Sequence, residues 1–464
     1  MKAKILNLNE LSAINPLDGR YRKKIEELSS FFSEFALIKT RLEVELKYFI
    51  ALSNTNVFRK LSAKEKKYLL DLLENFSLPD ATFIKNIEQV TRHDVKALEK
   101  FIREKIEKTS LKDTLEFIHF GLTSEDINNI SYRLIIQRSI KEIQIPLLIS
   151  IINSLVEKIE QNKKTVMIAR THGQKAIPTT LGKELSVFGI RLAKEISVLK
   201  TIKLTGKLNG AVGNFNALYF TYPNIDWINF SDKFIKSLNL EPNLTTTQIN
   251  TYEDLIQAFQ IFQRINSIFI DLSEDLWRYI SDDWFILINK RQEVGSSTMP
   301  QKINPIDFEN SEGNFGIANS LFEFFARKLP ISRLQRDLSD STVIRNIGIA
   351  FGYSLLGYKS LLQGLSRILP NKKQIDDDLH SDFAILAEGA QTFLRSVGAN
   401  DPYSAVKEKT RGKRIGEEKW QGIINSLDIE TEQKKRLTKL TPSTYIGLAE
   451  KITEKSLAQI NKLT

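Results

Sequence analysis

Residues 255–276 read LIQAFQIFQRINSIFIDLSEDL. Apolar side chains recur in this stretch every three or four residues, at Leu255, Phe259, Phe262, Ile265, Phe269, Leu272 and Leu276. This spacing places them on one face of an α-helix and predicts a helix of about six turns. So long an apolar face is buried only against other long helices, and the stretch therefore predicts a helical bundle.

Three further segments have the same helical spacing. Residues 181–199 carry a stripe formed by Leu181, Leu185, Phe188, Leu192, Ile196 and Leu199. In residues 132–161, Pro146 is expected to kink or interrupt the helix, because proline lacks the N–H that the helix needs. A fourth helix is expected after Asn304-Pro305, with apolar positions at Ile317, Leu321 and Phe324.

Shorter helical patterns with polar breaks lie on both sides of this region. We expect three domains, because a single core rarely grows beyond about 250–300 residues. These are an N-terminal helical domain (1–112), a central long-helix bundle (113–365) and a C-terminal helical domain (366–464). Strand signals are weak, with residues 212–222 as the one possible strand, so the predicted class is all-α.

Composition excludes several kinds of protein. The absence of cysteine excludes disulfide scaffolds, thiolate zinc sites and a cysteine nucleophile, and it suits a reducing cytoplasm. The N-terminus has no uninterrupted apolar segment, and the most apolar later stretch, residues 143–156, falls short of the roughly 20 residues that span a membrane. We therefore expect a cytoplasmic protein without a membrane partner.

The formal net charge of +10 is also compatible with a nucleic-acid-binding protein. A basic helical protein that binds nucleic acid would carry such a charge, and its binding would weaken with salt. Much of the lysine, however, lies in solvated helical patterns such as Lys64-Glu65-Lys66-Lys67. The main interpretation therefore has no nucleic-acid partner.

Three of the four histidines lie in polar clusters that are far apart in the sequence. His93 lies within Thr91-Arg92-His93-Asp94, His119 shortly precedes the Thr123-Ser124-Glu125-Asp126 block, and His172 lies within Arg170-Thr171-His172-Gly173-Gln174. Histidine serves acid and base chemistry near neutral pH. One such cluster is often only a turn, but three are expected to meet in one cleft if long helices bring them together.

Residues 293–305 form the most informative loop, EVGSSTMPQKINP. Glycine and two prolines favour a loop, consecutive hydroxyls offer hydrogen bonds, and Lys302 supplies a cation for an anionic substrate. Residues 333–345 add arginines among hydroxyls, whose forked guanidinium groups match carboxylate and phosphate. No phosphate-binding glycine loop or metal-spaced histidine pattern accompanies them, so we expect catalysis on a polyanion without cofactor or metal.

These blocks resemble the fumarase/aspartase superfamily, whose signature is a GSSxMPxKxNP loop. The early Asp18-Gly19-Arg20-Tyr21 and the later Ser339-Asp340-Ser341-Thr342 resemble the adenylosuccinate lyase family within it, in its bacterial form. The resemblance covers almost the whole chain, with the blocks in the family's order. It implies three helical domains, a homotetramer with a central bundle, and active sites built from several subunits.

The resemblance also implies a reaction and its catalytic residues. Fumarate would be eliminated from adenylosuccinate, giving AMP, and from the succinylcarboxamide ribotide of purine synthesis. Ser296 matches the family's general base, His172 its general acid, and Glu309 the partner that fixes the histidine tautomer. Substrate binding is implied for Arg20, Tyr21, Arg92, His93, Asp94, His119, Thr123, Ser124, Thr171, Gln248, Ser297, Lys302, Asn304, Asn310, Arg336, Ser341, Thr342 and Arg345.

Two positions differ from the commoner family pattern. Gln301 stands where many members have histidine, so a proton-shuttling role there is lost. Arg92 stands where asparagine often precedes the His-Asp pair and adds a cation near the expected nucleotide site. A sibling lyase acting on argininosuccinate or malate remains an alternative on the loop alone, as does a structural protein that keeps the fold without the activity.

Overall fold

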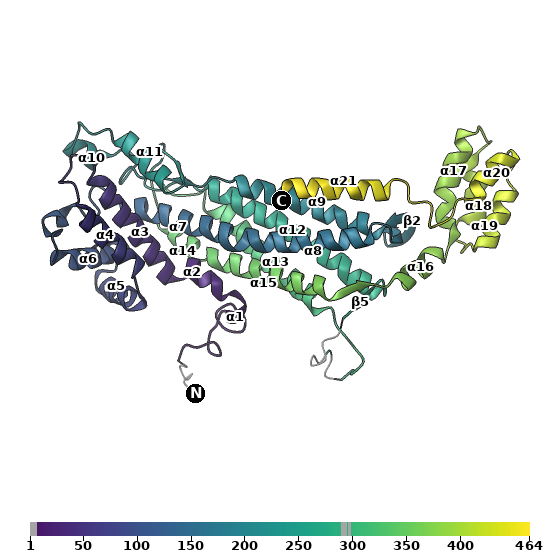
Figure 1. Cartoon of the computed structure of the whole chain (residues 1–464), viewed down its shortest axis with the longest axis horizontal. Helices are drawn as coiled ribbons and strands as arrows, with labels where there is room; N and C mark the ends of the chain where they lie inside the picture. Colours follow the sequence, from purple (N-terminus) through teal and green to yellow (C-terminus); the bar gives the residue numbers. More distant parts are fainter. Residues whose placement is uncertain (1–6, 289–294, 296–297) are drawn as a thin grey trace. The chain divides into compact units, whose positions relative to one another are not determined.

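The computed structural model describes residues 7–288, 295 and 298–464, and helices account for most of them (Figure 1). Strands within this range form three two-stranded pairs. The predicted all-α class is therefore confirmed for the described part of the chain. The chain divides into two compact units, each of which is described by itself.

Both units combine segments that are separate in the sequence. Unit 1 comprises Met1–Leu147, Val198–Asn266 and Asn314–Leu356, and unit 2 comprises Leu148–Ser197, Ser267–Gly313 and Gly357–Thr464. The long helices give residues to both units: α8 (Ile145–Asn162), α9 (Leu181–Thr201), α12 (Glu253–Ser281), α13 (Ile306–Lys328) and α15 (Ile347–Ser366). The division into 1–112, 113–365 and 366–464 stays a prediction.

Unit 1 also contains shorter elements. Its remaining helices are α1 (Arg22–Ile25), η1 (Glu26–Leu28), α2 (Ser29–Phe32), α3 (Glu34–Leu52), α4 (Ala63–Glu74), α5 (Leu78–Thr91), α6 (Asp94–Glu107), η2 (Lys112–Phe117), α7 (Ser124–Ser139), η3 (Ile140–Gln144), α10 (Asn216–Thr221), α11 (Trp227–Ser237) and α14 (Ser339–Ile344). Strands β3 (Thr205–Gly206) and β4 (Glu241–Pro242) pair in parallel. Apolar side chains of α3 to α6, including Phe49, Leu69 and Phe101, form an N-terminal core.

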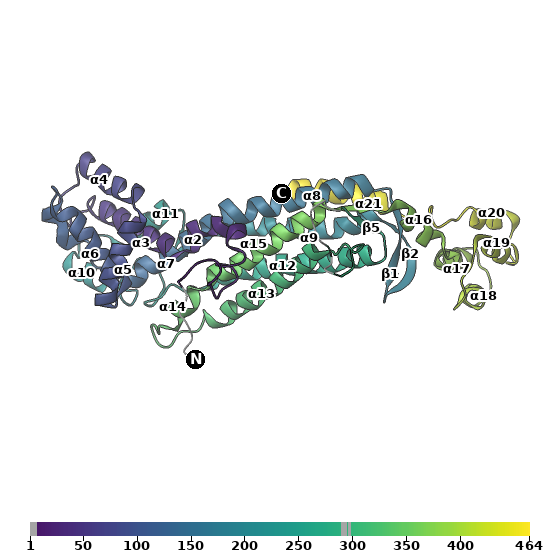
Figure 2. The same cartoon turned by 90° about the horizontal axis from the view of Figure 1, so that it is seen from below.

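Unit 2 contains two antiparallel strand pairs and the C-terminal helices. β1 (Val166–Thr171) pairs with β2 (Gln174–Thr180), and β5 (Phe285–Leu287) pairs with β6 (Ile368–Pro370). Figure 2 shows β1 and β2 running together as a hairpin. The helices are α16 (Lys372–His380), η4 (Phe383–Leu386), α17 (Ala387–Ser396), α18 (Pro402–Thr410), α19 (Glu417–Asn425), α20 (Thr431–Thr438) and α21 (Ala449–Leu463).

The two apolar stripes read from the sequence are buried, as predicted. Each stripe residue of α12 is 0% exposed, and those of α9 are at most 7% exposed. Within unit 1, Phe259 of α12 stacks on Phe322 of α13 with ring centroids 5.5 Å apart. Phe262 of α12 meets Phe351 of α15 edge to face at 5.0 Å. Burial of these aromatic side chains holds the long helices of this unit together.

Pro146 interrupts the α-helical hydrogen bonding, as predicted. α7 ends at Ser139, the π-helical turn η3 follows, and α8 begins at Ile145. The proline has no N–H for the carbonyl four residues earlier, and its ring crowds that carbonyl. A wider π-helical turn relieves both constraints without ending the helix.

The continuous helical stretch Ser124–Asn162 is long and apolar enough to cross a membrane by length and composition, with a mean hydropathy of 1.3 in its most apolar window. It is longer than the apolar stretch 143–156 considered in the sequence. The stretch includes Asp126 and Arg133, which are fully buried and ion-paired inside unit 1. Such pairs are typical of a core helix, because unshielded charges are costly in lipid.

One local prediction is wrong, and another is not settled by the single chain. Residues 212–222 contain helix α10 rather than a strand. On α13, Ile317 and Phe324 are 46% and 43% exposed in the single chain, so their burial in a bundle stays a prediction. The buried face instead carries Phe308, Phe315, Phe322 and Phe325. Apolar residues surround much of α13, so their spacing alone could not distinguish the buried face from the exposed one.

Candidate active site

A cavity of about 680 Å³, here called the unit 1 cavity, opens among segments that are far apart in the sequence. The structure brings together in its wall ten residues that the sequence placed in one site: Arg92, His93, Asp94, Thr123, Ser124, Gln248, Arg336, Ser341, Thr342 and Arg345. The rest of the wall consists of Arg41, Glu88, Glu125, Asn128, Tyr132, Tyr252, Leu338, Ile344 and Asn346.

The start of α7 supplies two hydroxyls to this wall. Thr123 is the N-cap residue of a capping box, and its N–H donates to the Asp126 carboxylate at 2.9 Å. The Lys207 ammonium donates to the same carboxylate at 2.8 Å, and both charged side chains are 0% exposed. A buried ion pair therefore holds Thr123 and Ser124 at the helix N-terminus, where backbone N–H groups favour anions.

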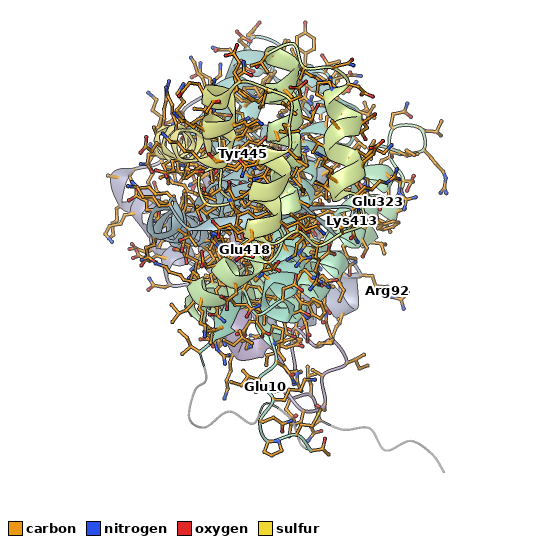
Figure 3. All side chains as sticks on the ribbon, turned by 90° about the vertical axis from the view of Figure 1, so that its right-hand side faces the viewer. Glu10, Arg92, Glu323, Lys413, Glu418 and Tyr445 are labelled. Atoms are coloured by element: carbon orange, nitrogen blue, oxygen red, sulfur yellow. The ribbon has the colours of Figure 1, made fainter. Side chains whose placement is uncertain are left out.

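The start of α6 supplies a histidine. His93 is the N-cap residue, and its Nδ1 accepts the Lys96 N–H at 3.1 Å. The proton of the neutral ring therefore lies on Nε2, which is 3.4 Å from the Ser124 hydroxyl oxygen. His93 therefore lies at a helix N-terminus in the cavity wall. Arg92, just before it, adopts a left-handed backbone conformation and is exposed (Figure 3).

Asp94 joins two arginines of the cavity wall. Its carboxylate lies 2.8 Å from the Arg41 guanidinium and 3.2 Å from that of Arg345. Burial alone would raise the pKa of Asp94, but the two arginines and the Val95 N–H lower it below its ordinary value. Asp94 therefore stays ionised and orients two cations of the wall; Arg41 also donates to Asn128 at 2.8 Å, and Arg345 also lies 3.5 Å from Glu34.

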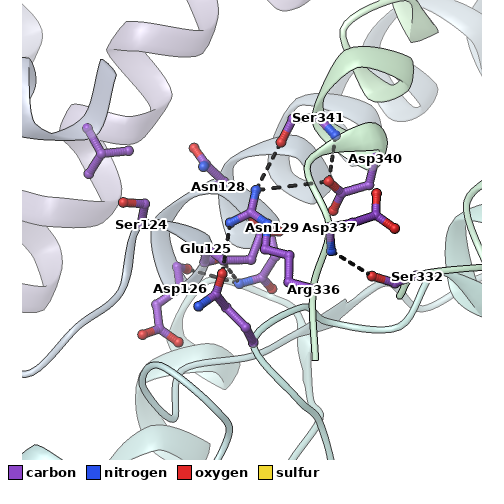
Figure 4. Close-up of polar contacts among 12 residues, drawn as sticks. Ser124, Glu125, Asp126, Asn128, Asn129, Ser332, Arg336, Asp337, Asp340 and Ser341 are labelled. Carbon is purple, nitrogen blue, oxygen red and sulfur yellow. Dashed lines mark hydrogen bonds and ion pairs between the residues drawn. The ribbon is translucent and has the colours of Figure 1, made fainter. Parts of the chain in front are cut away.

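Arg336 is the centre of a second polar cluster (Figure 4). Its Nη2 donates to the Ser341 hydroxyl at 2.9 Å and lies 3.3 Å from the Glu125 carboxylate. Its Nη1 donates to the Gln248 side-chain oxygen at 3.4 Å. Asp340 lies 4.0 Å from the same guanidinium. Two buried carboxylates thus share one cation.

The cluster contains two carboxyl groups, those of Glu125 and Asp340, and only one guanidinium, that of Arg336. Burial raises the pKa of Glu125 to about 7, with Arg336 opposing the rise and Asp340 adding to it. The tyrosine hydroxyl of Tyr252 donates to Asp340 at 3.0 Å. Burial and the nearby carboxylates raise the pKa of Tyr252 far above its ordinary value, so it acts as a neutral donor. The cavity therefore combines four arginines with hydroxyls and can bind a polar, anionic molecule.

His172 lies in unit 2, at the turn of the β1–β2 hairpin. Both His172 and Gly173 have positive φ, 53° and 74°, and Thr171 pairs with Gln174 across the turn. The side chains of Thr171 and His172 are exposed. Strand β2 separates His172 from the long helix α9. The tight turn explains why a glycine follows the histidine, since glycine tolerates the left-handed conformation.

The signature loop and the start of α13 also belong to unit 2. Asn304 donates its side-chain amide to the Gly295 carbonyl at 2.7 Å, and a Cβ at Gly295 would overlap the Lys302 carbonyl oxygen. Glycine is therefore required at 295. The predicted base Ser296 and its neighbour Ser297 lie outside the described residues.

Glu309 accepts a hydrogen bond from the Trp277 indole N–H at 3.1 Å. Its side chain is exposed, like those of Lys302 and Asn310. Among the described residues, no hydrogen bond joins Glu309 to His172. The role of Glu309 as the partner of His172 stays a prediction.

Three residues expected to bind substrate lie in unit 1 but do not line its cavity. Arg20 lies over the Tyr21 ring at 5.9 Å, near the start of α1. His119 Nδ1 lies 2.5 Å from the Glu45 carboxylate. Burial lowers the pKa of His119, but the Glu45 charge and hydrogen bond outweigh burial and raise it above its ordinary value.

Sequence reasoning missed several residues of the cavity wall. Glu125 and Asn128 belong to a block that had been singled out, so their proximity to Ser124 was a usable signal. Arg41 lies on α3 and Tyr132 on α7, two helices that mix apolar and polar residues, and Tyr252 directly precedes α12. Arg41 is 3% exposed, but in the sequence it stands among the other charged residues of α3, so nothing singled it out as a residue of the wall.

Comparisons with known proteins agree over nearly the whole chain. A family model described as lyase matches residues 19–317, and another described as adenylosuccinate lyase C-terminal matches residues 332–446. The adenylosuccinate lyase of Dictyostelium discoideum is 48% identical over 456 residues, which cover 96% of this chain and 98% of that protein. That of Haemophilus influenzae is 44% identical over 454 residues, or 97% and 100%. The fold is similar to that of fumarate lyase from Mesorhizobium sp. BNC1, with a TM-score of 0.76 at 16% identity, covering 93% and 97% of the two chains.

Proposed function

The chain belongs to the adenylosuccinate lyase family, and we propose that it eliminates fumarate from two substrates. One is adenylosuccinate, which gives AMP. The other is the succinylcarboxamide ribotide of purine synthesis, which gives the aminoimidazole carboxamide ribotide. The observation that carries the proposal is identity of 44% to 48% with adenylosuccinate lyases over nearly the full length of both chains.

The unit 1 cavity is proposed as the nucleotide end of the site. Its four arginines, with the N-termini of α6 and α7, offer positive charge and donors to a phosphate or carboxylate. His93, Ser124 and Ser341 add neutral hydrogen-bonding groups. No cofactor is needed for this chemistry, because the substrate itself supplies the leaving group.

Elimination requires a base and an acid. Ser296 is proposed to take the proton from the succinyl carbon adjacent to the one that bears nitrogen, and His172 to protonate the nitrogen as the carbon–nitrogen bond breaks. The electron pair of the broken C–H bond becomes the new double bond of fumarate. Ser296 must first lose its own proton, and the Lys302 ammonium is the loop cation that would stabilise the alkoxide.

The negative charge that develops on the succinyl carboxylate needs donors. Thr123, Ser124, Ser297, Lys302 and Asn304 are proposed to supply them. The Asn304 hydrogen bond to Gly295 supports this role for the loop, because it brings the loop ends together on either side of the proposed base. Glu309 is proposed to hold the His172 ring in the tautomer that donates a proton.

A homotetramer in the cytoplasm is proposed as the working form. Exposed apolar side chains on α13 support self-association, since Ile317 and Phe324 are seven residues apart and lie on one helix face. His172 is exposed on its hairpin and would complete a site with residues of other subunits. No nucleic acid or membrane enters this mechanism.

Turnover of adenylosuccinate by the purified chain tests the proposal. The ultraviolet spectrum should change from that of the succinylated nucleotide to that of AMP. Ser296→Ala should lower turnover by at least about a thousandfold while AMP still binds, because the base acts only in the transition state. The control Ser237→Ala, at an exposed serine of α11, should match the wild type. No spectral change at high enzyme concentration would refute the function, and near-normal turnover of Ser296→Ala would refute its role.

A further inference from the structure

We propose that Glu125 takes up a proton from solvent when an anionic group of the substrate pairs with Arg336. The inference rests on the proposed function, since it concerns ligand binding in the unit 1 cavity. It gives Glu125, which the resemblance did not single out, a role as a positioning residue. In the empty site its carboxylate holds Arg336, and after protonation it releases the guanidinium to the ligand.

The geometry makes Arg336 a shared cation. Glu125 and Asp340 lie 3.3 Å and 4.0 Å from its Nη2, and their side chains are 6% and 4% exposed. The Nε of Arg336 is buried without a protein hydrogen-bond partner among the described residues. The Arg336 side chain as a whole is 16% exposed and lines the cavity, so an anion there can reach the guanidinium.

Adding a third anion to this cluster costs electrostatic free energy. Arg336 carries one positive charge, and a bound phosphate or carboxylate would compete with two buried carboxylates for it. Like charges at such short distances in a poorly hydrated site repel strongly. One of the two carboxylates is therefore expected to become neutral when the ligand arrives.

Glu125 is the one that accepts the proton, because Asp340 has other partners. Asp340 accepts hydrogen bonds from the Tyr252 hydroxyl at 3.0 Å and from the Ser341 N–H at 2.6 Å. Within the described residues, the Glu125 carboxylate has Arg336 as its one ion-pair partner. Loss of Arg336 to a ligand thus leaves Glu125 without compensation while Asp340 keeps two donors.

The other charged groups around Glu125 are already engaged. Lys207 pairs with Asp126, and Arg133 pairs with Asp254. Tyr252 and Tyr132, whose pKa values are both raised, remain neutral. The pKa of Glu125 itself, raised to about 7, means that the proton is readily gained near neutral pH.

Calorimetric titration of the full chain with AMP tests the inference. AMP is a product of the proposed reaction and does not turn over. The binding enthalpy is measured at pH 7.5 in two buffers of different ionisation enthalpy, and the difference gives the number of protons taken up. Wild-type protein should gain about half a proton per AMP more than Glu125→Gln, whose side chain cannot titrate. Proton uptake by the AMP phosphate is the same for the wild type and for Glu125→Gln, so it cancels in the difference between the two proteins. Glu116→Gln, at a carboxylate with a side chain 83% exposed, should behave as the wild type.

The outcomes separate this inference from the proposed function. AMP binding with equal proton uptake in wild type and Glu125→Gln would overturn the role of Glu125 and leave the function standing. Absence of both AMP binding and adenylosuccinate turnover would overturn the function and this inference together. Should Glu125→Gln fail to fold, the pH dependence of AMP affinity in the wild type decides. If the affinity for AMP falls by up to about tenfold per pH unit above pH 8, proton uptake on binding is supported. If the affinity for AMP does not change with pH, proton uptake is refuted.

Discussion

At the scale of single residues, the buried carboxyl of Glu125 links protonation to folding. Its pKa is about 7 in the folded chain, above the ordinary value of 4.5, because burial penalises the charged form. Between these values the folded state binds more protons than the unfolded state, so stability falls as pH rises. This contribution is fully present below pH 4.5 and is lost as pH rises through 7.

Glu125→Gln should therefore become more stable relative to the wild type as pH rises from 5 to 8. A neutral side chain removes the desolvation cost, and the gain between the two pH values is expected to be on the order of 1 to 3 kcal/mol. Urea denaturation midpoints at fixed protein concentration measure it. Identical pH dependence of the two proteins would show that Glu125 ionises normally.

At the scale of elements, the start of α7 depends on the buried pair of Lys207 and Asp126. Lys207→Met removes the ammonium and leaves a fully buried carboxylate without its countercharge. The expected cost is about 3–5 kcal/mol in the free energy of unfolding. Lys203→Met serves as the control, because its ion pair with Glu241 is exposed, and it should leave the denaturation midpoint unchanged. Equal midpoints for both variants would contradict this account.

The elements differ in how far the sequence predicts them. The helices α9 and α12 were predictable because their stripes are local and periodic, and Pro146 indicated an interruption of the helix but not that it takes the form of a π-helical turn. The β1–β2 hairpin was not, because Val166-Met167-Ile168 is a short apolar run that fits a helix as well as a strand. Its pairing with residues 174–180 depends on a two-residue turn at His172 and Gly173 that only the backbone reveals.

The residues of the cavity wall also differ in how far they could be predicted from the sequence. Thr123, Ser124 and Arg336 stood in polar blocks and could be nominated from sequence. Arg41 and Tyr252 could not, because Arg41 is one of several charged residues on α3 and Tyr252 directly precedes α12, and only packing brings them to the wall. The exposure of Ile317 and Phe324 on α13 could not be predicted either, because apolar residues occur on both the buried and the exposed side of that helix.

At the scale of the whole molecule, the site is proposed to combine residues from more than one subunit. Mixing the inactive variants His172→Ala and Ser296→Ala, after dissociation and reassociation, should restore about a quarter of wild-type activity. Random assembly gives about one site in four with both residues intact if they come from different subunits. Each variant treated alone is the control and should stay inactive. No recovery in mixed tetramers, verified by sedimentation, would place both residues on one subunit.

The central claim, that the unit 1 cavity binds the substrate of a fumarate-eliminating lyase, is tested most directly by a paired measurement of kcat/KM for adenylosuccinate. Arg336→Lys keeps the charge that Glu125 and Asp340 need but loses the forked geometry, and kcat/KM should fall at least about tenfold. Arg333→Lys, three residues away, exposed and outside the cavity wall, should match the wild type. A wild-type chain without turnover, or an Arg336→Lys variant as active as Arg333→Lys, would contradict the claim.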